Sequence, residues 1–371
     1  MTRVLVLNCG SSSVRYKLFD GDDVTAKGHV ERIGEDGGEA ADHLSALRDL
    51  LDRLDLSGLA AVGHRVVHGG ERFTASTVIT DEVVAAVEEL IPLAPLHNPG
   101  ALTGIRVARK LLPDVPQVAV FDTAFHATIP PEGVLWAVDR ELARRYGLRR
   151  YGFHGTSHAY VSRETARILG KPVAGTNVIT LHLGNGASAA AVRGGRCEAT
   201  SMGMTPLPGL VMGTRSGDVD PSLIFHLHRV GGLGLDEIEE SLTRRGGLLG
   251  LTGDNDMRSV LDRRAAGDEE AALAFAIYAR RLREYVGSYL AVLGRVDAIT
   301  FTAGVGERSA VVRAAALEGL EPLGISVDPA RNEAGELIIS PDGAPIAVCV
   351  VPTDEEREIA NESRRALSLE G

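Results

Sequence analysis

Two segments of this sequence share one pattern, in which a hydrophobic strand reaches a turn of very small residues and then reverses into a second strand. The first segment, VLVLNCGSSSVRYKLF, spans residues 4–19, and the second, NVITLHLGNGASAAAVRGG, spans residues 177–195. A hairpin that recurs in both halves of a chain predicts two copies of one domain plan, with the two turns facing each other across a cleft. Two unrelated hairpins with glycine turns would give the same pattern, so the sequence leaves that alternative open.

Strand-like and helix-like segments alternate along the rest of the chain, which predicts an α/β fold. The hydrophobic runs predict strands at residues 3–8, 14–19, 60–67, 117–122, 177–184, 187–195, 298–304 and 344–351. A helix is expected over residues 80–93, with Thr80 or Asp81 as its N-cap. The longest helix is expected over residues 268–294, because apolar residues recur there at helical spacing. The residues at that spacing are Leu273, Ile277, Leu282, Val286, Tyr289 and Leu293.

The composition disfavours several classes of function. The chain has 371 residues, enough for about two domains. Its formal net charge of −11 disfavours a nucleic-acid-binding surface. No run of about 18 apolar residues occurs, so no membrane span is expected, and the sequence opens with a strand, so no signal peptide is expected. Cys9, Cys197 and Cys349 are too few for a disulfide framework, which favours a reducing, cytoplasmic compartment.

The first turn has the composition of an anion-binding loop. Gly10 lets the backbone approach a ligand closely, and Ser11, Ser12 and Ser13 add hydrogen-bond donors without bulk. Successive N–H groups in such a turn form a concave anion site. The turn leads into a strand and lacks the lysine of a P-loop, so it predicts a phosphate-gripping hairpin rather than a Walker site. An ordinary polar hairpin turn is the alternative.

Two more glycine turns point to the same class of ligand. Residues 182–186, HLGNG, close the second hairpin, and residues 304–306, GVG, end a strand just before a helix. A helix N-terminus favours an anion, although Asn-Gly is also the strongest signal of an ordinary hairpin. The pattern GxGxxG is absent here, so a dinucleotide-binding fold is not supported. Three such turns in one chain predict a polyphosphate ligand.

Two arginines stand where a cation needs an anionic partner. Arg65 lies beside Val66 and Val67 in a predicted strand, and Arg215 lies in a loop rich in proline and glycine. A guanidinium group matches a carboxylate or a phosphate bidentately. An arginine among apolar neighbours is unfavourable unless it meets an anion. A structural ion pair is the alternative for each of them.

Asp122 and His154 are candidate catalytic residues. Asp122 ends an apolar strand, where ligand sites of α/β sheets are commonly found, and the alternative is a helix N-cap. His154 lies in a loop of small residues, four residues before His158. A histidine pair at that spacing can bind zinc, but no glutamate completes a zinc motif, so we do not expect a zinc site.

Three adjacent acidic residues, Asp354, Glu355 and Glu356, lie between a predicted strand and the helix expected to follow it. Acidic residues at such a position can simply favour the helix dipole. They can also hold Mg²⁺, either directly or through water molecules.

Together these motifs resemble the acetate kinase family. The segments that carry the resemblance are NCGSSSVRY, GHRVVHGGE, PLHNP, FDTAFH, RYGFHGTSHAYV, HLGNGAS, SMGMTPLPGLVMGTRSGDVDP and FTAGVGE. They follow one another in order from about residue 4 to residue 360.

The resemblance implies the actin-like, sugar-kinase-like (ribonuclease H-like) ATPase fold, in which two similar α/β domains enclose the active site in a cleft. The implied first domain, residues 1–125 with 356–371, would bind acetate and Mg²⁺. The implied second domain, residues 126–355, would bind the nucleotide and form a homodimer. The implied reaction is reversible, Mg²⁺-dependent phosphoryl transfer from ATP to acetate by direct in-line displacement, with Mn²⁺ as an alternative ion. Its products are acetyl phosphate and ADP, propionate would be a slower substrate, and neither nucleic acid nor a membrane is an implied partner.

The same resemblance implies roles for individual residues. The catalytic residues would be Asp122, His154 and Arg215. The acetate-binding residues would be Arg65, Val67, Leu96, Phe153 and Pro206. The metal-binding residues would be Asn8 and Glu355. The nucleotide-binding residues would be Ser11, Ser12, Ser13, Arg15, His182, Leu183, Gly184, Asn185, Gly186, Asp256, Met257, Arg258, Gly304, Val305, Gly306, Glu307 and Arg308.

Two positions depart from the family pattern, which usually has lysine in place of Arg15 and asparagine in place of Arg308. Arg15 keeps the charge but not the compact geometry of an ammonium group. Arg308 adds bulk and charge near the expected nucleotide. These departures leave the nucleotide preference open.

Two alternative functions remain open on the sequence. One is a kinase of a longer acid, propionate or butyrate, because one methylene in an apolar pocket changes binding by only about 1–3 kcal/mol. The other is an actin-like or chaperone-like nucleotide switch, because a shared fold does not fix function. A switch without a small acceptor would have no need of Arg65 and its apolar neighbours.

Overall fold

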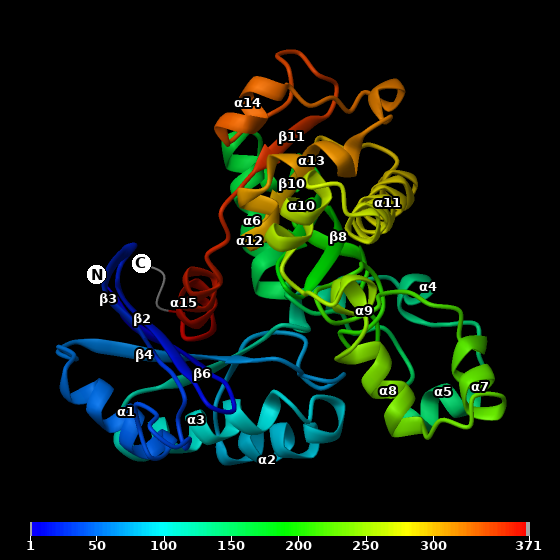
Figure 1. Cartoon of the computed structure of the whole chain (residues 1–371). Coiled ribbons are helices and arrows are strands. Elements are labelled where there is room, and N and C mark those ends of the chain that lie inside the picture. The colour runs from blue at the N-terminus through cyan, green and yellow to red at the C-terminus, as the bar shows by residue number, and fades with distance from the viewer. Residues whose placement is uncertain (1, 369–371) are drawn as a thin grey trace. The chain divides into compact units, whose positions relative to one another are not determined.

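The computed structural model describes residues 2–368, which divide into two compact units (Figure 1). The first unit contains residues 2–127, Phe153–Ser157 and 354–368, and the second contains Thr128–Gly152 and His158–Thr353. The predicted division into an acetate domain and a nucleotide domain stays a prediction. The ends of that predicted first domain, Met1 and residues 369–371, lie outside the described residues.

The first unit is built on a six-stranded sheet in the order β3-β2-β1-β4-β6-β5. Its strands are β1 (Arg3–Cys9), β2 (Val14–Asp20), β3 (Asp23–Val30), β4 (Leu59–Val66), β5 (Thr77–Val78) and β6 (Gln117–Phe121). Its helices are α1 (His43–Asp52), α2 (Asp81–Glu89), α3 (Asn98–Leu111) and α15 (Glu355–Ala366), with the 3₁₀ helix η1 (Ile91–Leu93) and most of η2 (Ala124–Thr128).

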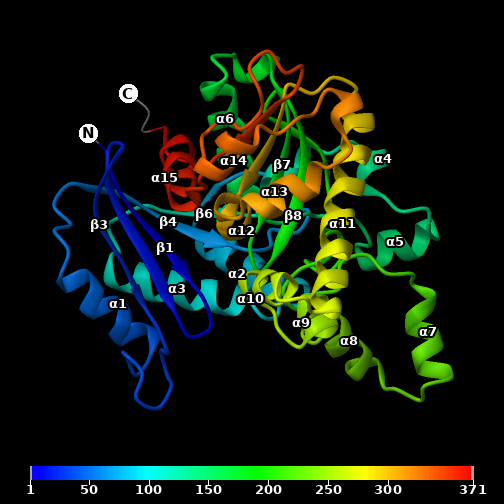
Figure 2. The same cartoon turned by 45° about the horizontal axis from the view of Figure 1, so that its top comes forward.

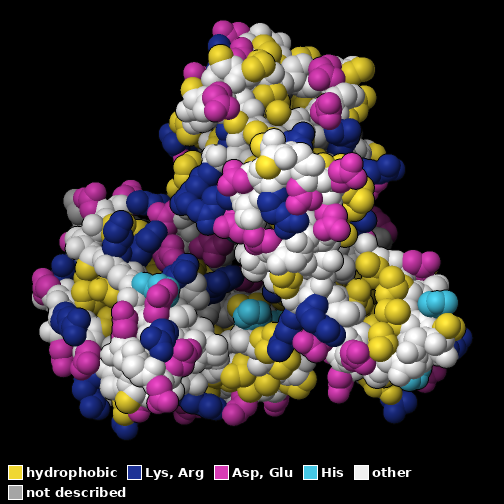
Figure 3. Space-filling view, in the orientation of Figure 1, with side chains coloured by type: hydrophobic (Ala, Val, Ile, Leu, Met, Phe, Trp, Pro, Cys, Tyr) yellow, Lys and Arg dark blue, Asp and Glu magenta, His cyan; other side chains and the backbone are white. Residues whose placement is uncertain are grey.

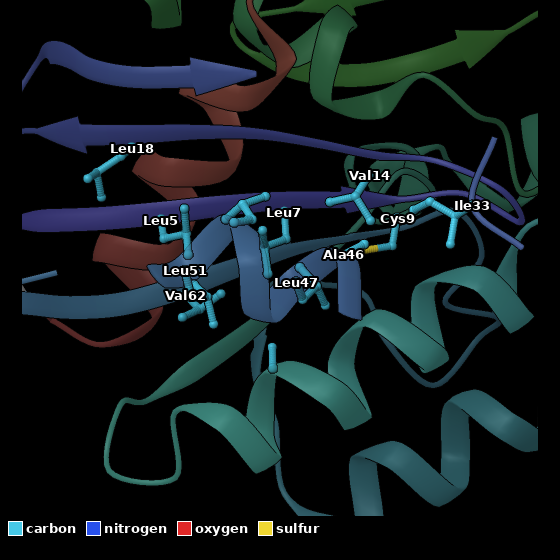
Figure 4. Close-up of a cluster of buried hydrophobic side chains, with 12 residues drawn as sticks. Leu5, Leu7, Cys9, Val14, Leu18, Ile33, Ala46, Leu47, Leu51 and Val62 are labelled. Carbon is cyan, nitrogen blue, oxygen red and sulfur yellow. The ribbon is translucent and has the colours of Figure 1, made fainter. Parts of the chain in front are cut away.

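Alternation along β1 sends its side chains into two separate cores. Leu5 and Leu7 belong to a buried cluster with side chains of α1 and α3 (Figure 4). Val4 and Val6 point to the other face, where they pack with Ile359 of α15. Helix α15 therefore covers the face of the first sheet to which Val4 and Val6 of β1 point.

The second unit is built on a five-stranded sheet in the order β11-β10-β7-β8-β9. Its strands are β7 (Asn177–Leu183), β8 (Ala187–Arg193), β9 (Arg196–Thr200), β10 (Ala298–Thr302) and β11 (Ala347–Val350). Its helices are α4 (Pro131–Val134), α5 (Arg140–Tyr146), most of α6 (Gly155–Ile168), α7 (Ser222–Arg229), α8 (Leu235–Thr243), α9 (Gly247–Thr252), α10 (Met257–Ala265), α11 (Glu269–Leu293), α12 (Ala303–Arg308), α13 (Ala310–Leu317) and α14 (Pro329–Ala334), with the 3₁₀ helices η3 (Val173–Gly175) and η4 (Glu321–Leu323). Figure 2 shows α6 and α11 on opposite sides of this sheet.

The two sheets have the same plan, which confirms the predicted repeat and the α/β class. The order β3-β2-β1-β4-β6 in the first sheet corresponds to β9-β8-β7-β10-β11 in the second. In each sheet the central strand, β1 or β7, pairs antiparallel with the strand that follows it across the hairpin. The same central strand pairs parallel with β4 or β10 on its other side.

All the strands predicted from the sequence are present, although several are shorter than expected. Strands β3, β5 and β9 were not predicted from the sequence. Most residues of β3 are exposed, so the strand lacks a hydrophobic run. Gly28 also interrupts its pattern, and the ring of Tyr16 on β2 lies where a side chain of Gly28 would stand.

The two predicted helices are present with small corrections. Thr80 is the N-cap of α2, and the expected continuation to residue 93 is the separate 3₁₀ helix η1, which contains Pro92. Asp268 caps α11, as the predicted start requires. Of the apolar residues in the predicted pattern of α11, Leu273 is 62% exposed, while Phe275 is buried instead.

The surface carries charges of both signs. Figure 3 shows lysine and arginine side chains interspersed with acidic ones over the face in view, so no unbroken basic area covers that face. Within residues 2–368, no helix combines the length and the apolar content that crossing a bilayer requires.

Close packing of α3 on β1 requires glycine at position 104, because a Cβ there would overlap Sγ of Cys9. We expect Gly104→Ala to lower the free energy of unfolding by about 1–3 kcal/mol, since the added methyl group overpacks this contact. Chemical denaturation measures the change. The matched control is Gly287→Ala in α11, where a Cβ would meet nothing within 4 Å. That substitution should raise stability by about 0.5–1 kcal/mol, and equal effects of the two substitutions would contradict the described packing of α3 on β1.

Candidate active site

The serine turn between β1 and β2 is fixed tightly from within the first unit. The N–H of Gly10 donates to the carbonyl oxygen of Ser13 at 2.8 Å, and Nε2 of His43 lies 2.9 Å from the carbonyl oxygen of Gly10. The start of α3 passes so close that a Cβ at Gly100 would stand 2.6 Å from the carbonyl carbon of Gly10. The close packing of α3 against this turn therefore requires glycine at position 100, while the small residues of the turn itself suit a ligand.

Beside this turn lies an open hollow of about 480 Å³ in the first unit. Its lining residues are Asn8, Gly10, Ser12, Ser13, Arg15, His29, Glu31, Arg32 and Arg65. Arg15 donates through Nε to Nε2 of His29 at 3.4 Å. Hydroxyl groups and three guanidinium groups thus share one space, which suits an anionic ligand.

Arg65 and Asp122 form a bidentate ion pair at the carboxyl ends of β4 and β6, which are adjacent and parallel. Nη2 of Arg65 lies 2.7 Å from Oδ2 of Asp122, and Nε lies 3.1 Å from Oδ1. Asp122 is 1% exposed. Burial disfavours the charged form of Arg65, but the carboxylates of Asp122 and Glu355 outweigh that effect, so the pKa of Arg65 is raised. The sequence left a structural ion pair open as the alternative role of Arg65. That ion pair is present, and it joins Arg65 to Asp122, which is itself a predicted site residue.

Glu355 begins α15 on the same side of the unit. Its Oε2 lies 3.8 Å from Nε of Arg65, and its side chain is 19% exposed. Burial raises the pKa of Glu355, and Arg65 opposes that rise. Asn8 lines the hollow described above. Among residues 2–368, no group of three or more histidine, cysteine, aspartate or glutamate side chains could hold a metal ion, so a cation here would need further oxygen ligands from substrate or water.

Phe153 and His154 lie in a strained loop just before α6. His154 has a φ of 55°, in the left-handed region that non-glycine residues rarely adopt. Strain of this kind is concentrated at functional sites. The N–H of Gly155 donates to the carbonyl oxygen of Asp122 at 3.1 Å, and a Cβ on Gly155 would overlap that oxygen. The loop backbone is thereby fixed directly against the end of β6.

In the second unit, five of the predicted nucleotide residues line one pocket of about 320 Å³. They are Gly184, Asn185, Asp256, Met257 and Val305. The pocket is completed by Gly213, Leu248, Asn255 and Tyr278. These four residues were not predicted from the sequence. Tyr278 lies on the predicted long helix, α11. The helical spacing of apolar residues does not reveal which of their side chains lines a pocket.

The glycine-rich segment after β10 is the helix α12 rather than an open turn, so the expected boundary was wrong. Ala303 starts it with a φ of 64°. Oε1 of Glu307 accepts hydrogen bonds from the N–H groups of Ala303 and Thr353, at 2.8 and 3.1 Å. The carboxylate of Glu307 therefore binds backbone N–H groups and stabilises the junction between β10 and α12.

Arg313 of α13 supports α12 from the interior and was missed by the sequence analysis. Its Nη1 donates to the carbonyl oxygens of Gly306 and Glu307, at 3.0 and 2.9 Å. Its Nε and Nη2 both donate to Asn332, each at 2.7 Å. Arg313 is 2% exposed, and burial lowers its pKa. A buried arginine in an amphipathic helix gives no sequence signal of this role.

Arg215 lies in the loop that connects β9 to α7. Its Nη1 lies 3.7 Å from Sδ of Met212, and it forms no ion pair with any residue from 2 to 368. Burial lowers the pKa of Arg215. Asp218 closes the base of the loop, because its Oδ1 accepts from the N–H of Gly209 at 2.8 Å. A partly buried cation with no counter-ion is suited to an anionic ligand.

Some of the predicted site residues do not line the hollow of the first unit or the pocket of the second unit. Leu96 is 62% exposed. Arg258 pairs with Asp256 at 2.6 Å, but its own side chain is 87% exposed. His154 belongs to the first unit, whereas Arg215 and Pro206 belong to the second, so their predicted convergence stays a prediction.

The remaining predicted residues have well-defined local places. His182 and Leu183 end β7, and Gly186 directly precedes β8. Val67 directly follows β4, and Ser11 is exposed at the tip of the first turn.

Comparison with known proteins gives matches over the whole chain. The sequence model of the Acetokinase family matches residues 3–361. The acetate kinase of Streptomyces coelicolor is 58% identical over 399 aligned residues, covering 100% of this chain and 98% of that protein.

Solved structures agree with the sequence matches. An acetate kinase from Porphyromonas gingivalis has a TM-score of 0.93 and 43% identity, covering 99% of this chain and 100% of that one. A propionate kinase from Francisella tularensis subsp. tularensis has a TM-score of 0.92 and 39% identity, covering 98% of this chain and 100% of that one.

A more distant structure bears on the fold alone. The ROK hexokinase of Thermus thermophilus has a TM-score of 0.51 and 15% identity, covering 99% of each chain. With the shared sheet order of the two units, these likenesses confirm the predicted actin-like, sugar-kinase-like fold class.

We expect Arg313→Met to lower the free energy of unfolding by about 3 kcal/mol, because it leaves buried carbonyl oxygens of α12 without their donors. Chemical denaturation followed by circular dichroism measures this change. Arg264→Met is the matched control, because Arg264 is exposed and its guanidinium carbon lies over the ring of Phe275, 4.5 Å from the ring centroid. That control should lose about 0.5–1 kcal/mol. Losses of the same size in both variants would mean that Arg313 does not support α12.

Proposed function

This chain belongs to the acetokinase family, and we propose that it transfers the terminal phosphoryl group of ATP reversibly to acetate, giving acetyl phosphate and ADP. It is accordingly a phosphotransferase whose acceptor is a carboxyl group. Within the proposed site, the observation that carries the proposal is the Arg65–Asp122 pair at the ends of β4 and β6.

The proposed reaction is a direct in-line displacement. One oxygen of the acetate carboxylate forms a bond to the γ-phosphorus, while the bond from that phosphorus to the bridging oxygen of ADP breaks and leaves its electron pair on ADP. Acetate is already ionised at neutral pH, so no base has to remove a proton. Charge in the loose transition state is spread over three equatorial oxygens. The protein therefore contributes positioning and electrostatic stabilisation.

Arg65 is proposed to hold the acetate carboxylate. Its Nε and Nη2 are engaged by Asp122, whereas Nη1 makes no hydrogen bond with any described residue and is left for the substrate. Asp122 is 1% exposed, which supports a role in orienting Arg65 rather than in touching acetate. The apolar residues proposed around the methyl group are Val67, Leu96, Phe153 and Pro206.

Arg215 and His154 are proposed to flank the transferred phosphoryl group. The lack of a counter-ion for Arg215 among the described residues supports this role, because an arginine of this kind stabilises charge that develops in phosphoryl transfer. The strained φ of 55° at His154 supports a functional constraint at that position.

The nucleotide is proposed to bind through both glycine-rich regions. The pocket formed by Gly184, Asp256 and Val305 with their neighbours supports a nucleoside site in the second unit. The serine turn and Arg15 line the hollow in the first unit and support contacts with phosphate oxygens.

Asn8 and Glu355 are proposed to hold Mg²⁺, with Mn²⁺ as an alternative ion. Their amide and carboxylate oxygens suit a hard cation, which commonly takes one or two carboxylates and completes its shell with phosphate oxygens and water. When bound, the ion would neutralise charge on the phosphate oxygens.

A homodimer through the second unit is also proposed. The support is a set of large apolar side chains on or beside α5, α7 and α8 that are 50–73% exposed. They are Leu142, Tyr146, Phe225, Val230 and Leu235. Large apolar side chains exposed to this degree are typical of interaction surfaces, and the proposed occupant is a second copy of this chain. The cytoplasmic location stays a prediction.

The test of the proposed function is acetate-dependent formation of ADP, with acetyl phosphate trapped by hydroxylamine as the hydroxamate. We expect kcat/KM to be highest for acetate and lower for propionate by about 10–200-fold, as one methylene is worth about 1–3 kcal/mol. The likeness to a propionate kinase supports propionate as a second substrate. ATP turnover that ignores acetate would sink the proposal and favour a nucleotide switch.

We expect Asp122→Asn to lower kcat by about 100-fold or more with little change in KM for ATP, because a misplaced Arg65 would hold acetate out of line. Steady-state kinetics with the hydroxamate assay measures the change. Asp114→Asn is the control, since Asp114 is exposed in the same unit. A rate for Asp122→Asn near that of the control would refute the assigned role.

We expect Arg215→Ala to lower kcat by about 1,000-fold or more, as for other arginines that stabilise a transferred phosphoryl group. The exposed Arg244 in the same unit provides the control variant, Arg244→Ala. Single-turnover measurements separate the chemical step from product release. An unchanged chemical step in Arg215→Ala would remove Arg215 from the mechanism.

A further inference from the structure

Lys17 is a cation of the first hairpin that the proposed function does not use. It lies on β2, and its Nζ lies 2.7 Å from Oδ1 of Asp354 and 3.1 Å from Oε2 of Glu356. All three side chains are 21–24% exposed. Partly buried ion pairs are screened by salt much less than exposed ones. Lys17 therefore joins the start of the chain firmly to the first turn of α15.

Glu355 stands between the two carboxylates that Lys17 binds. Successive residues of a helix are rotated by about 100°, so they point in different directions. Oε2 of Glu355 accordingly faces Arg65, at 3.8 Å from its Nε. Asp354 also accepts from the N–H of Arg357 at 3.1 Å and so caps α15. Both neighbours of Glu355 are thus fixed by other groups, while its own carboxylate faces Arg65, which is one of the residues that line the hollow.

We propose that Lys17 is a positioning residue for Glu355. By binding Asp354 and Glu356 together, it fixes the first turn of α15 with Glu355 directed toward Arg65. It also keeps the two flanking carboxylates from competing with Glu355 for the same cations. This inference rests on the proposed function, in which Glu355 belongs to the magnesium site.

Lys27 provides an internal comparison. It stands directly opposite Lys17 in the register of β2 and β3. Lys27 is exposed and forms no ion pair with the part of the chain that the structure describes. Replacing either lysine by methionine removes one positive charge and keeps a side chain of similar length, so the two variants differ only in the contacts with α15.

The kinetic experiment compares Lys17→Met, Lys17→Arg and Lys27→Met at varied Mg²⁺. For Lys17→Met we expect the Mg²⁺ concentration at half-maximal rate to rise about tenfold, within the range found for residues that orient metal ligands. KM for acetate should change less than about twofold, because Arg65 keeps its partner Asp122. Lys17→Arg should restore most of the Mg²⁺ response, and Lys27→Met should match the unmodified chain.

Two further measurements do not depend on turnover. Hydrogen exchange of the ligand-free protein should show faster exchange at the amides of residues 355–358 in Lys17→Met but not in Lys27→Met. In a background that carries Asp354→Asn and Glu356→Gln, adding Lys17→Met should change the Mg²⁺ response by less than about twofold, because the coupled groups are already neutral.

The outcomes separate this inference from the proposed function. If the unmodified chain lacks acetate-dependent turnover, the proposed function itself fails. If turnover is present and Lys17→Met has the Mg²⁺ response and exchange pattern of Lys27→Met, only the role of Lys17 is overturned. If Lys17→Met does not fold, Glu356→Gln keeps the contact with Asp354 and should show a smaller rise in the same direction. The absence of any rise there would also overturn the role.

Discussion

A guanidinium group bound by a buried carboxylate at the ends of two parallel strands is the interaction on which the proposed site depends. Asp122 cannot exchange its partner for water, because only 1% of it is exposed. A carboxylate in that position would be strongly unfavourable without Arg65. The backbone of Gly155 is bonded to the same strand end, and Glu355 lies beside Arg65. Segments from four distant parts of the chain are thereby ordered around one ion pair.

The two copies of the sheet plan have specialised in different ways at equivalent places. In the first unit, β4 ends in charged and apolar side chains, with Arg65 paired to Asp122. In the second unit, the corresponding strand β10 leads into α12. There the backbone at Gly304 carries no side chain and faces open space, and Arg313 donates a hydrogen bond to the carbonyl oxygen of Gly306. One copy therefore presents side-chain charge, and the other presents bare backbone. Side-chain charge suits a small carboxylate, whereas open backbone suits a larger ligand that needs close approach.

Much of this arrangement could be predicted from the sequence, because local patterns carry it. Continuous hydrophobic runs located the central strands, and the small residues between them located both turns. The edge strands β3 and β9 were missed, because an edge strand can be polar on much of its surface. Arg65 stood out among its valines, and Asp122 stood out at a strand end. By contrast, Tyr278, Arg313 and Lys17 take their roles from residues far away in the sequence, and no local spacing reveals such partners.

The position of α15 has a consequence for how the protein is made. This helix covers the face of the first sheet that carries Val4, Val6 and Phe19, yet it is synthesised after the entire second unit. A ribosome adds roughly 5–20 residues per second, so the nascent chain keeps that apolar face uncovered for many seconds. Products that stop before residue 355 never acquire the cover. Such truncated chains would be natural clients of chaperones and proteases, and full-length chains would complete their first unit last.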